Sequence, residues 1–397
     1  MSILSVPSVP GNLIQEASEV HELVIGLRRA VHRRPEVGLT LPATQAAVLQ
    51  ALAPLGLTTT TGRSCSSVVV RIEGALPGPT TLLRADMDAL PITERSGEPY
   101  ASTVPGVMHA CGHDAHTAML AGAAHVLARR RERLAGTAVL VFQPGEEGYG
   151  GCLAMLGEGL LDDHSPDRAF ALHQSPTLAS GHVAGRPGQL LASSDQFTVT
   201  VTGRGGHASR PHEADDVLGA ATAFVQTLHA RVTRAADPAH PWQVAVSTCH
   251  AGTAPGVVAD RAVLEGGVRA MDATGRERAM ALVRHVAEGV ASAHGCAADV
   301  TWSPAAPPTV NDPDQTSFAL GTATALIGAD RVHTLERPAF AAEDFGHILA
   351  KVPGALLQLG TRPPGAETPA PNHSPLMRLD EDALTAGVAL YAALALA

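Results

Sequence analysis

Lysine is almost absent from this chain: Lys351 is the only lysine among its 397 residues. This scarcity argues against Schiff-base chemistry, which needs a lysine amine. The phosphate-binding motif GxxxxGK[ST] does not occur, so a P-loop protein is excluded. Acidic residues (38) outnumber basic ones (28), and the net charge of -10 argues against nucleic acid or an acidic membrane surface as a partner.

Cysteines and long apolar runs are also scarce. The five cysteines are odd in number and widely spread, which fits a reducing compartment rather than a disulfide framework. The longest apolar stretch, residues 383–397, is too short to span a bilayer and is typical of a buried terminal helix. Residues 1–11 lack the basic region of a signal peptide. We therefore expect a soluble, cytoplasmic protein.

Groups that bind metals or move protons are concentrated in one short stretch. One cysteine, three histidines and an aspartate lie between His109 and His116. Cys111 and His113 are two positions apart, so in extended backbone both side chains would leave on the same face and could hold one metal. A helical pattern over residues 115–131 would place them at a helix N-terminus, which favours a thiolate. Taken alone, the stretch also fits a helix start with a buried structural thiol.

The order of the expected elements divides the chain into two domains. Buried strand patterns alternate with helices in residues 1–189 and again in 304–397, which predicts an α/β domain with a mostly parallel sheet sandwiched by helices. Residues 190–303 follow the order β-α-β-β-α-β, which predicts an inserted ferredoxin-like α+β domain. A single helix is expected over residues 15–32. The strands expected in the larger domain cover residues 67–72, 80–85, 137–143, 167–172 and 355–359.

Three of these strands are followed by ligand-type side chains. Asp86 and Asp88 follow one strand, Glu146 and Glu147 the next, and His173 a third. Because the carboxyl ends of parallel strands meet at one edge of a sheet, we expect these groups to lie close together. If the remaining candidates join them, the metal ligands are Cys111, His113, Glu147, His173 and His373.

Five ligands are too many for one tetrahedral zinc ion with room for water, and they suit two adjacent divalent ions that share a bridging group. A thiolate bridge from Cys111 favours zinc over magnesium or calcium. Of the adjacent carboxylates, Glu147 would bind metal while Glu146 takes and returns a proton. Asp86 or Asp88 would orient a ligand histidine, although aspartates also cap strand ends in proteins without such a site.

The segment Gly203–Ala208 imitates a dinucleotide-binding glycine motif. Pro211 interrupts the helix start that such a motif requires, and the flanking pattern is not a parallel βαβ unit. We interpret the segment as a tight turn that presents His207.

Taken together, these segments resemble the M20 metallopeptidase family, in particular its amidohydrolase branch of N-acyl-amino-acid, hippurate and auxin-conjugate hydrolases. They occur in the family's order over nearly the whole chain. The matching stretches are HRRPEVG from His32, LRADMDALPI from Leu83, MHACGHDAHTAML from Met108, FQPGEEGYGG from Phe142, ALHQSP from Ala171, GRGGHASRPHEADD from Gly203, AAEDF from Ala341 and NHSPLMRLDEDAL from Asn372.

The resemblance implies a binuclear site formed by the five ligands named above, with Glu146 as general base and Asp86 in a catalytic or orienting role. It implies that the inserted domain is a lid through which a homodimer forms. On that lid, His207 would stabilise the tetrahedral oxyanion, often in the neighbouring subunit's site. Arg269 would bind the substrate carboxylate.

One position departs from the family pattern. A GTAxNVIPD-like segment is usual, whereas this chain has Gly252–Asp260 with Gly256 in place of the asparagine. Because that asparagine is expected to contact substrate, substrate recognition is expected to differ here.

The sequence thus predicts a metal-dependent amidohydrolase that cleaves a small N-acyl-amino acid into a carboxylate and a free amino acid. It would use two divalent ions per subunit, with zinc favoured and manganese, cobalt or nickel as alternatives. Two other interpretations stay open: a dipeptidase or carboxypeptidase with the same mechanism, and a metal-binding relative without turnover.

Overall fold

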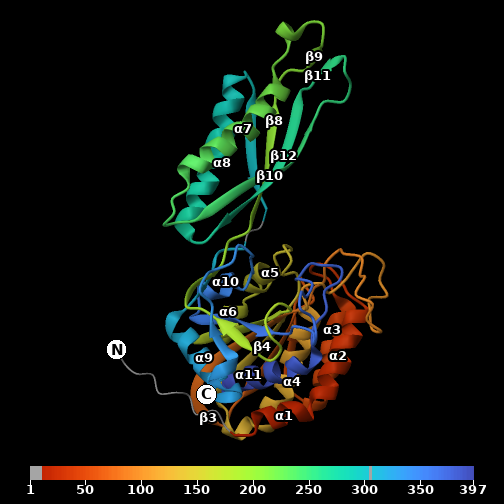
Figure 1. Cartoon of the computed structure of the whole chain (residues 1–397), viewed down its shortest axis with the longest axis vertical. Coiled ribbons are helices and arrows are strands. Elements are labelled where there is room, and N and C mark those ends of the chain that lie inside the picture. Colours follow the sequence, from red (N-terminus) through yellow and green to blue (C-terminus); the bar gives the residue numbers. More distant parts are fainter. Residues whose placement is uncertain (1–10, 304–305) are drawn as a thin grey trace. The chain divides into compact units, whose positions relative to one another are not determined.

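The computed structural model describes residues 11–303 and 306–397, which form two compact units (Figure 1). The first unit comprises the chain up to Leu190, Val310–Arg337 and Asp344–Ala397, and the second comprises Leu191–Thr309 and Pro338–Glu343. Residues 1–10, on which the expectation of no signal peptide largely rests, lie outside the described residues.

The first unit is built on an eight-stranded sheet with the order β1-β2-β4-β3-β5-β16-β6-β15. Its four central strands run parallel: β4 (Ala135–Gln143), β3 (Leu76–Asp86), β5 (Arg168–Ser175) and β16 (Gly354–Gly360). On either side, β2 (Val68–Glu73) and β6 (Val183–Gly185) pair antiparallel with this centre. The outermost strands are β1 (Thr58–Thr61) and β15 (Val332–Thr334). The expected mostly parallel sheet is therefore confirmed, with antiparallel additions at both sides.

Helices cover both faces of this sheet, which explains why its central strands are continuous apolar runs rather than alternating ones. One face carries α1 (Leu13–Glu19), α2 (His21–Arg33), α3 (Pro42–Leu52), α4 (His113–Arg129), α9 (Pro313–Ile327) and α11 (Leu384–Leu396). The other face carries the shorter α5 (Gly151–Gly157), α6 (Leu160–His164) and α10 (Gly346–Leu349). Helix α4 is buried along almost its whole length, so the site at its N-terminus rests on a rigid element.

The single helix expected over residues 15–32 is wrong, because the structure has two helices here, with a break at Val20. Val20 leaves the helical conformation, with φ -103° and ψ 4°. Its side chain is nevertheless buried, as are those of Ala17 and Val24 on either side. The apolar period continues through the break, so the sequence pattern does not reveal it.

The second unit has the element order β8 (Asp195–Thr202), α7 (Val217–Ala235), β10 (Trp242–Ala251), β12 (Arg261–Ala270), α8 (Ala273–Ala293), β13 (Ala297–Trp302). Its antiparallel sheet has the order β10-β12-β8-β13, as in a ferredoxin-like domain. Asp216 and Asp272 cap the two helices by accepting the backbone N–H of Gly219 and Gly275. Both helices pack against one face of this sheet around a separate hydrophobic core.

Two parts of the second unit lie outside the range 190–303 given by the sequence pattern. The unit extends to Thr309, and residues 338–343 return to it late in the chain. Residues 338–343 are joined to this unit by hydrogen bonds: the backbone N–H of Ala192 donates to the carbonyl oxygens of Ala339 and Ala341, at 3.1 and 2.9 Å. A short antiparallel pair, β9 (Gly206–His207) and β11 (Val257–Val258), carries the glycine-rich segment. Strands β7 (Gly188–Leu191) and β14 (Thr309–Asn311) lie where the chain passes between the units.

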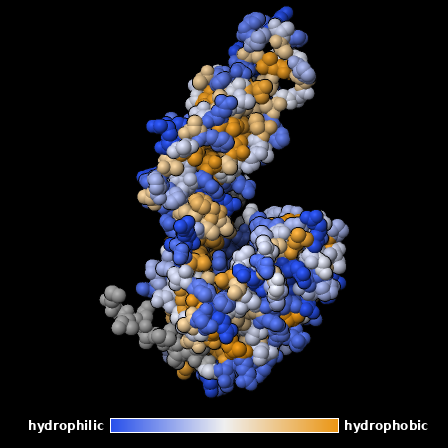
Figure 2. Space-filling model, viewed as in Figure 1, coloured by the Kyte–Doolittle hydropathy of each residue, from blue (hydrophilic) through white to orange (hydrophobic). Residues whose placement is uncertain are grey.

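Hydrophilic and hydrophobic residues are interspersed on the face of the molecule seen in Figure 2. Among the described residues, no helix combines the length and apolar character needed to cross a membrane. The apolar C-terminal helix α11 is instead buried against α4 and α9 in the first unit.

Candidate metal centre

The carboxyl ends of the central parallel strands deliver acidic and imidazole side chains to one edge of the sheet. Asp86 is the last residue of β3, and the loop after β4 carries Glu146 and Glu147. His173 lies within β5, two residues before its end, rather than after the strand as expected. His373 comes from the long loop after β16. The expected convergence at this edge is thus realised by four separate segments.

Cys111 and His113 lie in the turn at the N-terminus of α4, as expected, although the backbone between them is not extended. Gly112 adopts a left-handed conformation, with φ 82° and ψ 22°, and precedes the first helical residue, His113. An added Cβ at Gly112 would also lie 2.6 Å from Cγ of Gln174, so glycine is required both by conformation and by space. This turn, not strand geometry, brings the thiol and the imidazole together.

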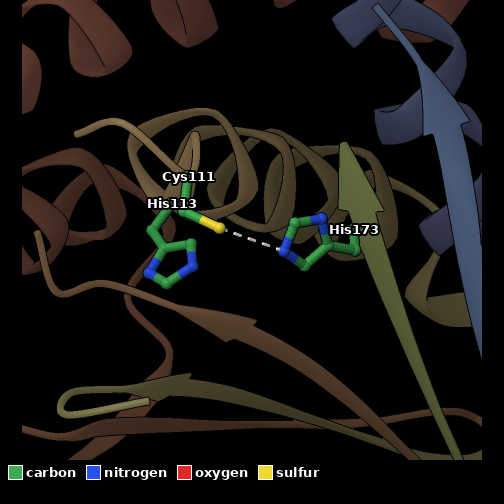
Figure 3. A group of neighbouring side chains, drawn as sticks. All are labelled: Cys111, His113 and His173. Carbon is green, nitrogen blue, oxygen red and sulfur yellow. Dashed lines mark hydrogen bonds between the residues drawn. The ribbon is translucent and has the colours of Figure 1, made fainter. Parts of the chain in front are cut away.

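Two groups of three potential ligands meet at Cys111. One consists of Cys111, His113 and His173, shown in Figure 3, and the other of Cys111, Glu147 and His373. Within each group the ligand atoms lie within 4.8 Å of one another. The five side chains expected to bind metal are therefore gathered, and Cys111 is the member that both groups share.

His173 directs one ring nitrogen toward Cys111. Its Nδ1 lies 2.7 Å from the carbonyl oxygen of Gln174. Since a carbonyl can only accept, Nδ1 carries the proton and Nε2 presents its lone pair on the side of Cys111. That Nε2 lies 3.4 Å from the Cys111 sulfur, toward which it points in Figure 3. A ligand histidine held by its second nitrogen in this way is typical of metal sites.

The two aspartates near His113 have different surroundings. Asp88 lies 3.5 Å from Nδ1 of His113 and accepts the backbone N–H groups of Glu146 (2.9 Å) and Glu147 (3.1 Å). Asp86 lies 3.5 Å from Nε2 of the same ring. Among the described residues, neither ring nitrogen of the buried His113 makes a well-directed hydrogen bond. Asp88 thus holds the glutamate loop and faces Nδ1 of His113, which leaves Nε2 as the nitrogen of this ring that could bind a cation.

Asp86 belongs to a buried network that the sequence did not reveal. It bonds to Arg84 at 2.8 Å and to Nδ1 of His116 at 2.5 Å, while Nε2 of His116 accepts the backbone N–H of Gln174 at 2.7 Å. His116 therefore has both nitrogens engaged, and the cluster of Asp86, His113 and His116 is not suited to a further ion. Burial raises the pKa of Asp86, but His113, His116 and Arg84 outweigh it and hold that pKa well below its usual range. Asp86 is therefore an ionised carboxylate.

Electrostatics favour the metal-binding form of Cys111. Burial raises the pKa of the thiol, yet His173 and His113 outweigh that effect and lower it to about 6. Interactions with Cys111 and Glu147 raise the pKa of His373 to about 10. His373 Nε2 lies 3.2 Å from Oε1 of Glu147, whose own pKa is lowered chiefly by His373 and His113 against the effect of burial. The imidazoles thus stabilise a thiolate and a carboxylate between them, as a cation would.

The residues present fit two borderline divalent cations. Each group offers the soft sulfur of Cys111, completed by two imidazoles in one case and by an imidazole and a carboxylate in the other. Sulfur and imidazole ligands suit zinc and similar ions, whereas magnesium and calcium prefer sites made of oxygens.

A second buried ionic network lies behind the turn. His32 bonds to Asp114 (2.8 Å) and Glu94 (3.1 Å), and Arg28 donates to Asp114 (2.9 Å). Burial lowers the pKa of His32, but Asp114 and Glu94 outweigh it and raise that pKa to about 9. The protonated imidazole is therefore part of the folded structure.

This shift predicts a pH dependence of stability. Because the folded pKa of His32 is raised above the unfolded value, its contribution is fully present below about pH 6.5 and is lost as the pH rises through about 9. Urea unfolding should show a contribution of up to about 3 kcal/mol that disappears over this window. His32→Gln should remove this part of the pH dependence, whereas His125→Gln, which alters a buried histidine bonded to a backbone carbonyl, should keep it. If the free energy of unfolding changed equally with pH in wild type and in His32→Gln over this window, the assignment would be contradicted.

The remaining two predicted residues, His207 and Arg269, lie in the second unit. His207 is exposed on β9, and its Nδ1 accepts the backbone N–H of Ser209 at 3.1 Å, which leaves the proton on Nε2. Arg269 is half-buried on β12, and burial lowers its pKa. The neighbouring carboxylate of Asp195 is held by Arg276 at 2.9 and 2.7 Å, and Arg269 has no salt bridge within the described part of the chain.

The mostly parallel sheet thus carries, at its carboxyl edge, two groups of potential metal ligands that share one thiol. The profile of Peptidase family M20/M25/M40 matches residues 82–397, and the chain belongs to this family. It is therefore an M20 hydrolase, and relatives in this family act on amide bonds.

Three relatives show the extent of the similarity. The chain is 35% identical over 388 residues to Thermostable carboxypeptidase 2 of Saccharolobus solfataricus, covering 97% of both proteins. It is 35% identical over 376 residues to N-acetylcysteine deacetylase of Bacillus subtilis, covering 94% of this chain and 96% of that protein. The crystal structure of the Bacillus subtilis YXEP protein, described as a dinuclear metal binding peptidase from the M20 family, is similar with a TM-score of 0.80 and 31% identity, covering 96% of this chain and 98% of that one.

Proposed function

We propose that the protein is a metal-dependent amidohydrolase that cleaves N-acyl-amino acids to a carboxylate and a free amino acid. The observation that carries this proposal is the pair of ligand groups that share Cys111, with the carboxylate of Glu146 beside them. Cys111 would bridge two cations, with His113 and His173 on one and Glu147 and His373 on the other. Zinc is favoured by this donor set, with manganese, cobalt or nickel as alternatives.

When bound, the two cations would supply a water molecule of lowered pKa and polarise the scissile carbonyl. Glu146 is the proposed general base. Its Oε2 lies 3.9 Å from Nε2 of His113, the same distance as Oε1 of Glu147, so both carboxylates face the ligand ring. Glu146 belongs to neither of the groups centred on Cys111. As general base, its carboxylate would take a proton from water and return it to the leaving amine.

The two aspartates, Asp86 and Asp88, would position different groups of the site. Asp88 fixes the glutamate loop through two backbone N–H groups and faces Nδ1 of His113, which suits a residue that orients both the base and a ligand. Asp86 is tied to Arg84 and His116, and His116 in turn accepts the backbone N–H of Gln174, the residue after His173. We therefore place Asp86 in an orienting role rather than in contact with substrate.

The second unit would act as a lid that also forms a homodimer. The protonated Nε2 of His207 is a donor of the kind that stabilises an oxyanion. The carboxylate of Asp195, which lies near Arg269, is already bonded to Arg276. The guanidinium of Arg269 is therefore suited to bind a substrate carboxylate.

The departure at Gly256 provides a test of substrate recognition. An added Cβ at this position meets no atom within 4 Å, and the Gly256 carbonyl accepts the backbone N–H of Ala208, next to His207. Gly256→Asn should therefore fold normally and change KM for N-acyl-amino acids by about tenfold, the effect of one hydrogen bond, with a smaller effect on kcat. Steady-state kinetics check this expectation. An unchanged KM would separate this position from substrate recognition.

A second candidate function is cleavage of a C-terminal peptide bond by the same machinery, favoured by the similarity to a carboxypeptidase. The deciding experiment removes metal with a chelator, restores zinc, manganese, cobalt or nickel separately, and compares turnover of N-acetyl- and N-benzoyl-amino acids with that of dipeptides. The proposal expects faster turnover of the N-acyl-amino acids. Preference for dipeptides would favour the peptidase, and two bound ions without any turnover would indicate a metal-binding relative.

A further inference from the structure

The side chain of Gln174 lies among the segments that carry the proposed ligands. Gln174 is fully buried on β5, directly after His173. Its Nε2 donates to the carbonyl oxygen of Cys111 and to Oδ1 of Asn372, both at 2.7 Å. Its Oε1 accepts the hydroxyl proton of Thr361, also at 2.7 Å. A primary amide has two N–H donors, and here each one bonds to a different ligand-bearing loop.

The backbone of Gln174 also forms hydrogen bonds to residues around the proposed metal site. Its carbonyl accepts from Nδ1 of His173, and its N–H donates to Nε2 of His116. The side chain also fills the space beside Gly112, where a Cβ would lie 2.6 Å from Cγ of Gln174. Gln174 therefore contacts the turn before α4, the strand of His173 and the loop of His373 at once.

The loop of His373 needs such restraints. His373 has a φ of 66°, a left-handed conformation that is uncommon for a residue with a Cβ. Strained conformations of this kind persist only where the surroundings hold them in place. Two bonds do so here: the backbone N–H of His373 donates to the carbonyl of Ala110 at 2.8 Å, and the preceding Asn372 accepts from Gln174. The first bond joins this loop directly to the segment of Cys111, and the second joins it to Gln174, which in turn donates to the carbonyl oxygen of Cys111.

We propose that Gln174 is a positioning residue, whose amide sets the separation of Cys111 and His373 and thereby the affinity of the cation these two residues share with Glu147. This inference rests on the proposed function only for the presence of two bound ions. Without the amide, the loop of His373 would lose its connection to Cys111 through Gln174, keep only the bond to Ala110, and relax from its left-handed conformation. The cation between His113 and His173 would be less affected, since those residues are held by α4 and β5.

The test compares Gln174→Met, which keeps the length of the side chain but cannot hydrogen-bond, with Thr361→Val, which removes the bond to Oε1 and leaves both Nε2 bonds. Proteins loaded with two zinc ions are titrated with a chromophoric chelator, which gives a dissociation constant for each ion. In Gln174→Met, the weaker-held ion should bind about 10- to 100-fold less tightly, as when other groups that support ligands are removed. Both constants should stay at the wild-type values in Thr361→Val.

A spectroscopic measurement separates positioning from general destabilisation. With cobalt in place of zinc, the thiolate-to-metal absorption reports the bonds to Cys111, and it should change in Gln174→Met but not in Thr361→Val. Should Gln174→Met fail to fold, Gln174→Leu also removes both donors and adds no charge. Wild-type zinc constants in the variant that folds, or equal weakening in Thr361→Val, would overturn the proposal.

These measurements need no substrate. A wild-type protein that holds two zinc ions but cleaves no N-acyl-amino acid would contradict the proposed function and leave the test of Gln174 intact. Conversely, an active wild type with an unaffected Gln174→Met variant would contradict only the role of Gln174.

Discussion

Glu146→Gln is expected to bind both metal ions and to lose about 100- to 10,000-fold in kcat, the usual contribution of a positioned general base. The substitution keeps the shape of the side chain and removes only its ability to take a proton. Metal binding should survive because Glu146 belongs to neither ligand group centred on Cys111. Elemental analysis and steady-state hydrolysis of an N-acetyl-amino acid give the two quantities.

The matched variant is Glu147→Gln, at the adjacent position in the same loop. Glu147 shares a ligand group with Cys111 and His373, so this variant should lose metal as well as activity. We therefore expect Glu146→Gln to lose activity and keep its metal ions, and Glu147→Gln to lose both. Undiminished hydrolysis by Glu146→Gln, or loss of an ion from it, would remove Glu146 from the role of base.

Cys111→Ala is expected to lose at least one of the two ions and to reduce turnover by more than about 100-fold, the upper end for changes that only support a ligand. Cys111 is the residue that both ligand groups share, so its loss removes a donor from each. Elemental analysis after dialysis against metal-free buffer measures the stoichiometry.

Cys65→Ala is a suitable control, because the Cys65 side chain has the same 7% exposure as Cys111 but lies outside both ligand groups. It should keep two ions and normal turnover, whatever it does to stability. Two ions retained in Cys111→Ala would refute the bridging thiolate.

The sheet could be predicted largely because its strands are short apolar runs of uniform character. Strand β4 is buried along its C-terminal two thirds, and the sequence pattern showed this directly. The strands that escaped prediction were marginal ones, such as β1, made of four threonines, and the three-residue β6 and β15. Such segments become strands because a neighbouring strand offers unpaired backbone N–H and C=O groups, and the local sequence pattern does not indicate this.

The site was predicted in part, and the missed residues share one property. Besides the bonds of Arg84 and His116 to Asp86, these residues bond to partners 58 or more positions away in the chain: Arg84 to Gln143, His116 to the backbone of Gln174, and Gln174 to Cys111 and Asn372. Residue type and spacing indicate which groups bind metals, but not which buried amides and guanidiniums hold those groups. The network of Asp114 and His32, 82 positions apart, was missed for the same reason.

The sequence by itself determined which chemistry is available: a thiol, imidazoles and carboxylates placed at the ends of strands that must be parallel, because helices alternate with them. The tertiary structure decided how those groups divide. It made Cys111 the shared member of two groups, placed Asp88 on the glutamate loop and Asp86 on His116, and held His373 in a left-handed conformation. The physical reason is that residue type fixes what a side chain can bind, whereas its partners depend on distances between segments far apart in the chain.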